Sequence, residues 1–141
     1  MRKLSRTAFG SVLAASTFLL AASARASTLS DFQARFTLTS LCLGQSELVL
    51  RGQPVSSGET PTPEAVVSWI ALVSENVGDL AQTASRGGVT NEQKKTMAGG
   101  LNAVAAILRD HAALAHNRGF EAAASTLAAL EATCRSAIGR L

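Results

Sequence analysis

Residues 62–84, TPEAVVSWIALVSENVGDLAQTA, decide the fold of this chain. The threonine at the start can cap a helix, the proline after it has no amide hydrogen to leave unpaired in a first turn, and Glu64 complements the helix dipole. Apolar side chains then recur in alternating steps of four and three residues, the spacing of a helix that buries one stripe in a bundle. The members of this stripe are Val66, Ile70, Val73, Val77, Leu80 and Ala84, and Trp69 widens it.

Two more helices are predicted after this stretch. Residues 90–118 begin with a capping box formed by Thr90 and Gln93. The helix is expected to end at Arg118, because the glycine that follows it favours a helix C-terminus. Residues 120–138 form an alanine-rich segment, whose small side chains let helix axes approach closely. A glycine pair, Gly99 and Gly100, interrupts the first of these helices at a cost of about 1 kcal/mol per residue relative to alanine. The pair therefore marks either a late helix start or a close approach by another helix.

The first helix is expected over residues 30–50, where Ser30 and Gln33 form another capping box. Two β-branched threonines and a glycine weaken the pattern, and the alternation over residues 47–51 would also suit a short strand. The inner face of this helix is expected to hold Phe32, Leu38, Leu41, Cys42 and Leu48.

Together the four helices predict an all-α fold, an antiparallel four-helix bundle. Residues 52–61, GQPVSSGETP, form the one long loop, because proline and glycine do not continue a helix there. The other joints are short, which favours pairing between successive helices. In this arrangement the first and last helices are also neighbours.

Residues 1–26 have the pattern of a bacterial export signal. A short basic region precedes an apolar run over residues 8–22, and Ala24 and Ala26 place small side chains at the −3 and −1 positions of a cleavage site. The run is shorter than the roughly 20 residues of a membrane-spanning helix, so an uncleaved membrane anchor is the less favoured alternative. We expect cleavage of the signal peptide after Ala26 and a single mature domain over residues 27–141, with no stable membrane insertion.

The charge balance argues against nucleic-acid binding. The whole chain carries a formal net charge of +3, but four of its basic residues and none of its acidic ones lie in the signal segment. The 115 mature residues hold 9 basic and 10 acidic groups, a net charge of −1. Phosphate neutralisation needs clustered lysine and arginine, and only Lys94-Lys95 approaches a cluster. We therefore expect no nucleic-acid partner, and a mature protein in the periplasm or secreted from the cell.

Cys42 and Cys134 are the two cysteines of the sequence. An exported protein meets an oxidising compartment, where an even number of cysteines favours a disulfide. Both lie on the predicted inner faces of the first and last helices, which are neighbours in the expected bundle. A disulfide between Cys42 and Cys134 is therefore expected, and it would close a loop of about 90 residues worth roughly 4 kcal/mol in the chain-entropy model. Two buried free thiols are the alternative.

Candidate metal-binding or acid–base residues are few. His111 falls on or beside the core face of its helix, whereas His116 lies about 140° further around it, so the two cannot hold one ion as a pair four residues apart would. Glu75 and Asp79 are four residues apart and could pair on one face, although a solvated face is the simpler interpretation. The sequence holds no nucleophile elbow, phosphate-binding loop or dinucleotide motif. We predict no catalytic residues, no metal site and no cofactor, and hence no enzyme.

The stretch 118–141 resembles the last helix of the periplasmic c-prime-type cytochromes, which are four-helix bundles of similar size. That family ends in an alanine-rich helix whose Cys-x-x-Cys-His motif attaches and ligates haem. Here residues 134–138, CRSAI, keep only the first cysteine, with alanine and isoleucine in place of the second cysteine and the histidine. The resemblance implies a bundle without covalent haem, and a non-covalent haem would need His111 or Met97.

Two functions of different classes suit an exported bundle without catalytic residues. The favoured one is a binding, adaptor or chaperone-like module with a protein partner that the sequence does not identify. The alternative is a carrier of a small ligand or non-covalent cofactor in the bundle interior, lined by Trp69, Met97 and His111. The alanine-rich surfaces could also be buried against a second copy, which leaves a homodimer open.

Overall fold

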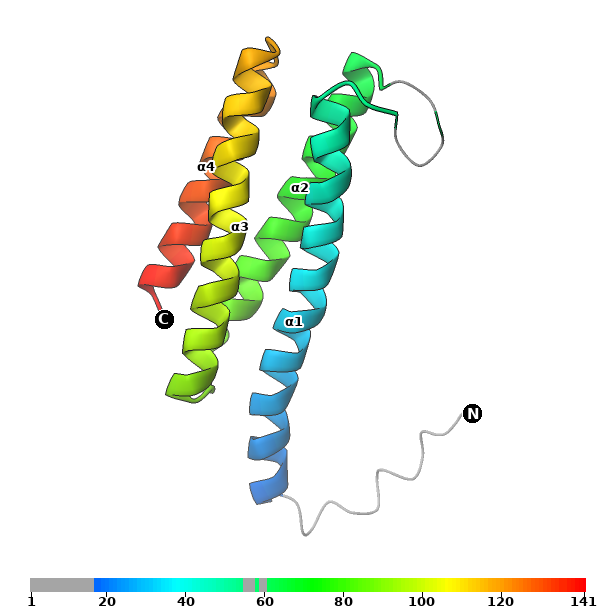
Figure 1. The fold of residues 1–141 in the computed structure, drawn as a ribbon. Helices are drawn as coiled ribbons and strands as arrows, with labels where there is room; N and C mark the ends of the chain where they lie inside the picture. Colours follow the sequence, from blue (N-terminus) through cyan, green and yellow to red (C-terminus); the bar gives the residue numbers. More distant parts are fainter. Residues whose placement is uncertain (1–16, 55–57, 59–60) are drawn as a thin grey trace.

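The computed structural model describes residues 17–54, 58 and 61–141, with side chains from Thr28 onward. Within this part of the chain the secondary structure is entirely helical, with no strand. The prediction of an all-helical chain with four helices is therefore confirmed. The helices, labelled in Figure 1, are α1 (Thr17–Leu50), α2 (Pro63–Ala84), α3 (Asn91–Asn117) and α4 (Glu121–Gly139).

The starts of α2 and α3 follow the capping chemistry expected from the sequence. The hydroxyl of Thr62 accepts a hydrogen bond from the backbone N–H of Ala65 at 3.2 Å. At α3, the Thr90 hydroxyl accepts from the Gln93 N–H at 3.1 Å, and the Thr90 N–H donates to Gln93 Oε1 at 2.9 Å. Each cap satisfies backbone donors that the first turn of a helix leaves without a partner.

Glycines in the left-handed region terminate α1 and α3. Gly52 has φ 73° and Gly119 has φ 83°, a conformation that strains residues with a side chain. After α3, the Gly119 N–H donates to the His116 carbonyl at 3.0 Å and the Phe120 N–H to the Ala115 carbonyl at 2.8 Å. This paired closure of the last turn leads the chain directly into α4.

The four helices form a ring in the order α1, α2, α4, α3. The most extensive packing lies within two hairpins, α1–α2 and α3–α4, and the contacts α2–α4 and α1–α3 join the hairpins along two seams. Figure 1 shows that α1 ends at the same end of the molecule as the turn between α3 and α4. There the Arg118 guanidinium donates to the Leu50 carbonyl at 2.9 Å and ties the two hairpins together.

The prediction that the first and last helices are neighbours is wrong. α1 packs on α2 and α3, and α4 packs on α3 and α2, so α1 and α4 occupy opposite corners of the ring. The reason is that the chain crosses from α2 to the diagonal corner before α3 begins. On the α1–α2 side, Arg86 pairs with Asp31 at 2.8 Å and Arg35 with Asp79 at 3.3 Å.

α1 turns a different face to the core than expected. Leu38 and Leu41, predicted inside, are 56% and 65% exposed. Two core positions hold polar side chains instead: the Thr39 hydroxyl donates to the Arg35 carbonyl at 2.7 Å and the Ser46 hydroxyl to the Leu43 carbonyl at 3.0 Å. A count of apolar residues misses such a stripe. The buried residues of α1 are Thr28, Phe32, Thr39, Leu43, Ser46, Val49 and Leu50.

α1 also begins earlier than predicted. The helix starts at Thr17, so Ser30 lies inside it and does not cap it. Alanine and leucine, which dominate the preceding segment, are strong helix formers, and the helix therefore continues through the expected cleavage site after Ala26. The rest of the predicted signal, residues 1–16, lies outside the described residues. The strand considered for residues 47–51 does not form, because the helix continues to Leu50.

Candidate functional site

The three residues predicted to line an interior ligand site do not come together. Met97 is fully buried in the core, His111 is 5% exposed and Trp69 is half-buried at its edge. Met97 and His111 lie 14 residues apart on α3, about 21 Å along the helix axis. The hollow beside His111 is lined by neither Met97 nor Trp69. The bundle interior is thus packed around Met97 and offers no common site to this trio.

His111 is held neutral in a confined place at the α1–α3 seam. Its Nε2 lies 3.8 Å from Glu47 Oε1, too far for a good hydrogen bond, and its buried Nδ1 has no hydrogen-bond partner among the described residues. Burial lowers the pKa of His111, although Glu47 and Asp110 act in the opposite direction. The adjoining hollow measures about 190 Å³, which is below the usual size of a ligand pocket.

The expected disulfide between Cys42 and Cys134 is not present, and both residues are free thiols. The physical reason is the ring order: Cys42 lies on α1 and Cys134 on α4, at opposite corners. Burial raises the pKa of the Cys134 thiol to about 11 and raises that of Cys42 as well. Both side chains are therefore poor sources of thiolate, which argues against a nucleophilic role.

The carboxylates of α2 do not form an acid–base pair. Asp79 forms the ion pair with Arg35 described above, and Glu75 is exposed. In the part of the chain that the structure describes, no group of three His, Cys, Asp or Glu side chains is placed to hold a metal ion. His116 Nδ1 lies 2.9 Å from Glu121 Oε2, an exposed contact between the end of α3 and the start of α4.

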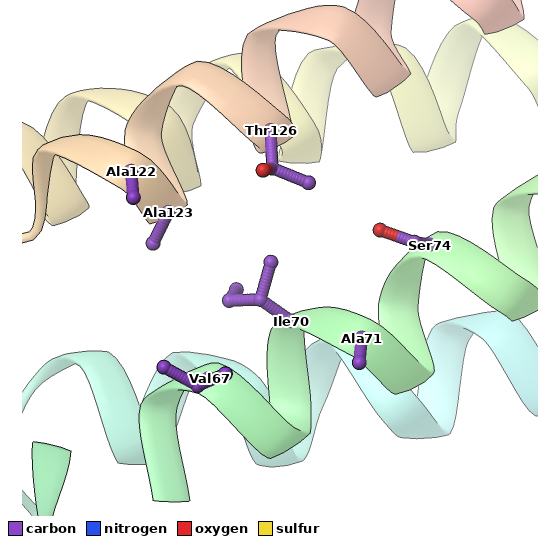
Figure 2. Close-up of a pocket in the computed structure, with 7 residues that line it drawn as sticks. All are labelled: Val67, Ile70, Ala71, Ser74, Ala122, Ala123 and Thr126. Carbon is purple, nitrogen blue, oxygen red and sulfur yellow. The ribbon is translucent and has the colours of Figure 1, made fainter. Parts of the chain in front are cut away.

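A shallow hollow lies at the α2–α4 seam. Figure 2 shows Ile70 of α2 pointing towards Ala122 and Ala123 of α4, with the hydroxyls of Ser74 and Thr126 further along the same gap. Its volume is about 260 Å³. A hollow of this size admits a few water molecules or a single side chain, and it falls short of the 300–1,000 Å³ typical of ligand pockets.

A larger groove lies at the other seam, between α1 and α3. Its volume is about 540 Å³, which is within the range of small-molecule pockets. The rings of Phe32 and Phe36 line the α1 side, with centroids 6.4 Å apart and planes inclined by 18°. We call this feature the α1–α3 groove; it is lined by Phe32, Gln33, Phe36, Thr37, Thr96, Gly99, Gly100 and Ala103.

The two glycines on the α3 side of the groove differ in their surroundings. A Cβ on Gly100 would lie 3.0 Å from Cε1 of Phe32 and 3.3 Å from Cδ1 of Phe36, so the helices approach closely here only because residue 100 has no side chain. A Cβ on Gly99 would meet nothing within 4 Å. Of the two interpretations of the glycine pair, close approach is confirmed for Gly100. The late helix start is wrong, because α3 begins at Asn91.

Sequence reasoning pointed to part of this groove and missed the rest. The glycine pair was a usable signal, and Phe32 was expected to face inward. Phe36 was not identified, although it lies four residues after Phe32 and therefore on the same helical face. The polar rim, formed by Gln33, Thr37 and Thr96, gave no signal, because uncharged polar residues on a helix surface are common.

No family model, curated protein or solved structure matches this chain. The helices of the described residues also include none with the length and apolar character needed to cross a membrane.

Proposed function

We propose that this protein is a small exported binding module whose binding site is the α1–α3 groove. The observation that carries the proposal is the groove's volume of about 540 Å³ beside two phenylalanine rings. Apolar lining with a few polar groups is the usual composition of a ligand site. The proposal adopts the carrier function that was the alternative in the sequence analysis, and it moves the site from the packed interior to a seam between helices.

Export rests on the signal pattern of residues 1–26, and the fold is compatible with cleavage. Cleavage after Ala26 would leave α1 at 24 residues, from 27 to 50. Asp31, Phe32 and Phe36 would all be retained, so the ion pair with α2 and the groove would remain. Figure 1 shows α1 extending beyond α3 at its N-terminal end. We propose a mature protein that begins at Ser27 and acts in the periplasm or outside the cell.

We further propose that successive helices run antiparallel in the mature bundle. The ion pairs between α1 and α2 support this, because Asp31 pairs with Arg86 and Arg35 with Asp79, so residue numbers rise along α1 as they fall along α2. A non-catalytic role is part of the same proposal. It is supported by the raised pKa of Cys134 and by the exposure of Glu75.

The test is native mass spectrometry on the protein recovered from the exported fraction of the cells that make it. We expect a chain starting at Ser27 together with a non-covalently retained mass. Gly99→Leu, which places a side chain in the groove, should lose this mass. Gly78→Leu is the matched control, because residue 78 is also a helical glycine whose Cβ would meet nothing within 4 Å. It should retain the mass.

Two results would contradict the proposal. One is wild-type protein that carries no retained mass; the other is a mass that Gly99→Leu retains as fully as Gly78→Leu. A mass that includes residues 1–26 would contradict cleavage without affecting the groove.

A protein partner or a second copy is the second candidate, favoured by exposed leucines on α1 and α2. Leu38 and Leu41 are 56% and 65% exposed, and Leu72 is 43% exposed. The Thr39 hydroxyl of α1 lies 3.4 Å from the Asn76 carbonyl of α2. Because residue numbers rise along α1 as they fall along α2, Leu72, one turn before Asn76, lies at the level of Cys42, about one turn after Thr39. The three leucines leave the outside of the α1–α2 hairpin with exposed apolar side chains. Leu41→Glu should abolish association in analytical ultracentrifugation if this face binds protein, and an unchanged sedimentation profile would contradict it.

A further inference from the structure

We infer that the α1–α3 groove takes an uncharged, planar aromatic molecule that carries a hydrogen-bond donor. This inference rests on the proposed function and specifies the chemistry of its ligand. It draws on four features of the groove: its size, the absence of charge in its lining, the pair of phenylalanine rings, and the acceptors at its rim.

The size of the groove suits a small molecule. The lining spans residues 96–103 of α3 and residues 32–37 of α1, about 10 Å along the longer side at 1.5 Å per residue. A helix bound in a groove is held by anchors at positions i, i+3 or i+4, and i+7, which span about the same length, so it is the volume of about 540 Å³, within the range of small-molecule pockets, that favours a small molecule. One or two fused rings fit within the available length.

The lining carries no charged side chain. The nearest charges along α3 are Glu92, four residues before Thr96, and Lys95, four residues before Gly99, so each lies one turn from the groove. They have opposite signs and both are exposed, so their effects on a ligand largely cancel. A charged ligand would lose hydration in this groove without gaining a partner, and we therefore infer a neutral one.

The aromatic lining favours a planar ring over a flexible chain. Phe36 is half-buried and presents its ring to the groove, whereas the ring of Phe32, 2% exposed, packs beside it at an inclination of 18°. An aromatic ligand against the Phe36 ring would gain stability beyond the burial of area alone. On the α3 side of the groove, Gly99 presents backbone without a side chain, and a Cβ there would meet nothing within 4 Å. Nothing packs against Gly99 closely enough to require a glycine there. We infer that the lack of a side chain at this position keeps the groove wide.

The rim supplies hydrogen-bond acceptors. The hydroxyl of Thr37 donates to the Gln33 carbonyl at 3.1 Å and that of Thr96 to the Glu92 carbonyl at 3.3 Å. Each hydroxyl hydrogen is thus used within its own helix, while the oxygen can still accept. A ligand N–H or O–H group at the edge of the ring would match these oxygens.

The inference is tested with two dyes that share one skeleton. N-phenyl-1-naphthylamine is neutral and has one N–H group, and 1-anilinonaphthalene-8-sulfonate adds a negative charge. The exported protein is titrated with each dye, and fluorescence gives the affinity. We expect the neutral dye to bind one per chain, and the sulfonate to bind at least about tenfold more weakly. Gly99→Leu should weaken the neutral dye by about tenfold or more, whereas Gly78→Leu should leave its affinity unchanged.

A second variant tests the aromatic preference separately. Phe36→Leu keeps the groove apolar but removes one ring, so it should weaken the neutral dye. We expect 2-naphthol to displace the dye from the wild-type protein and 1-dodecanol to displace it poorly. Circular dichroism melting of each variant confirms that it is folded.

Each contrary outcome overturns a different statement. Equal binding of the sulfonate overturns the inference of a neutral ligand, and displacement by dodecanol as effective as that by naphthol overturns the aromatic one. In both cases sensitivity to Gly99→Leu would still support the groove as a binding site. Dye binding that Gly99→Leu and Phe36→Leu leave unchanged would overturn the proposed function as well.

Discussion

The imidazole of His111 links the stability of the fold to pH. Burial lowers its pKa from the ordinary 6.5, so the unfolded chain binds a proton that the folded chain resists. The contribution of His111 to the stability of the fold is therefore complete at pH values above the pKa that the residue has in the unfolded chain. This contribution decreases as the pH falls below that pKa. We expect the free energy of unfolding, measured with urea, to decrease between about pH 7.5 and pH 5.5.

Variants at the two histidines separate this effect from other titrations. His111→Gln should remove most of the decrease. His116→Gln is the control at an exposed histidine, and the decrease should persist in it. Glu47 and Asp110, which face His111, remain in both variants. An undiminished slope in His111→Gln would assign the titration to another group.

The two thiols should remain reduced even in an oxidising compartment, because α1 and α4 lie at opposite corners of the ring. We expect iodoacetamide to label Cys42, which is half-buried, before Cys134, which is fully buried with a pKa raised to about 11. The intact mass, recorded without reductant, should equal that of the reduced chain. A mass lower by about 2 Da would indicate a disulfide and a different packing of α1 and α4.

At the scale of helices, neighbouring glycines of α3 should respond in opposite directions to the same substitution. Gly99→Ala adds helix propensity in open space and should stabilise by about 0.5–1 kcal/mol. Gly100→Ala gains the same propensity, but its Cβ would meet the ring of Phe32 at 3.0 Å. Phe32 is only 2% exposed and cannot retreat, so overpacking of about 1–3 kcal/mol should dominate. Thermal unfolding measures both; stabilisation by Gly100→Ala would show that α1 can move away.

Two threonines of α1 allow the cost of a polar residue in the core to be measured. Thr39 is buried and Thr37 is exposed, and each hydroxyl donates to the carbonyl four residues earlier. Thr39→Val should stabilise by about 1 kcal/mol, because the carbonyl keeps its helical hydrogen bond and a buried hydroxyl is replaced by a methyl group. Thr37→Val should change stability by less than about 0.5 kcal/mol. Destabilisation by Thr39→Val would mean that the 3.4 Å contact with the Asn76 carbonyl matters for α1–α2 packing.

The helices could be predicted because their signals are local. The caps at Thr62 and Thr90 and the stop at Gly119 each depend on a few adjacent residues. The core face of α1 could not be predicted, since Thr39 and Ser46 occupy positions where the pattern calls for apolar side chains. Hydrogen bonds within the helix make these exceptions tolerable, and a sequence pattern does not record them.

The order of helices in the ring is a property of the whole molecule and escaped prediction for that reason. Short joints are compatible both with a neighbouring placement of α3 and with the diagonal crossing observed after α2. The expected disulfide failed for the same cause. The groove was only partly foreseen: Gly100 signalled a close approach, but the hollow exists because two hairpins meet along a seam.

The two hairpins correspond to continuous halves of the chain, and this makes the protein a natural candidate for splitting into fragments. The joint contains Gly87 and Gly88, both exposed and both with positive φ. A break between them leaves each hairpin intact, with an apolar face that only the other half covers. We expect fragments 27–87 and 88–141, expressed together without the signal segment, to associate one to one and recover the helical circular dichroism of the mature chain. A break after Val104 would divide α3 and should not support association.

The groove would then make this association depend on its ligand. Phe36 belongs to the first fragment and Gly99 to the second, so a molecule bound in the groove contacts both halves at once. By thermodynamic linkage, such a molecule tightens the association of the fragments by the same factor by which association tightens its own binding. Attached to the halves of a reporter enzyme, the two fragments would act as a sensor for whatever molecule the groove holds.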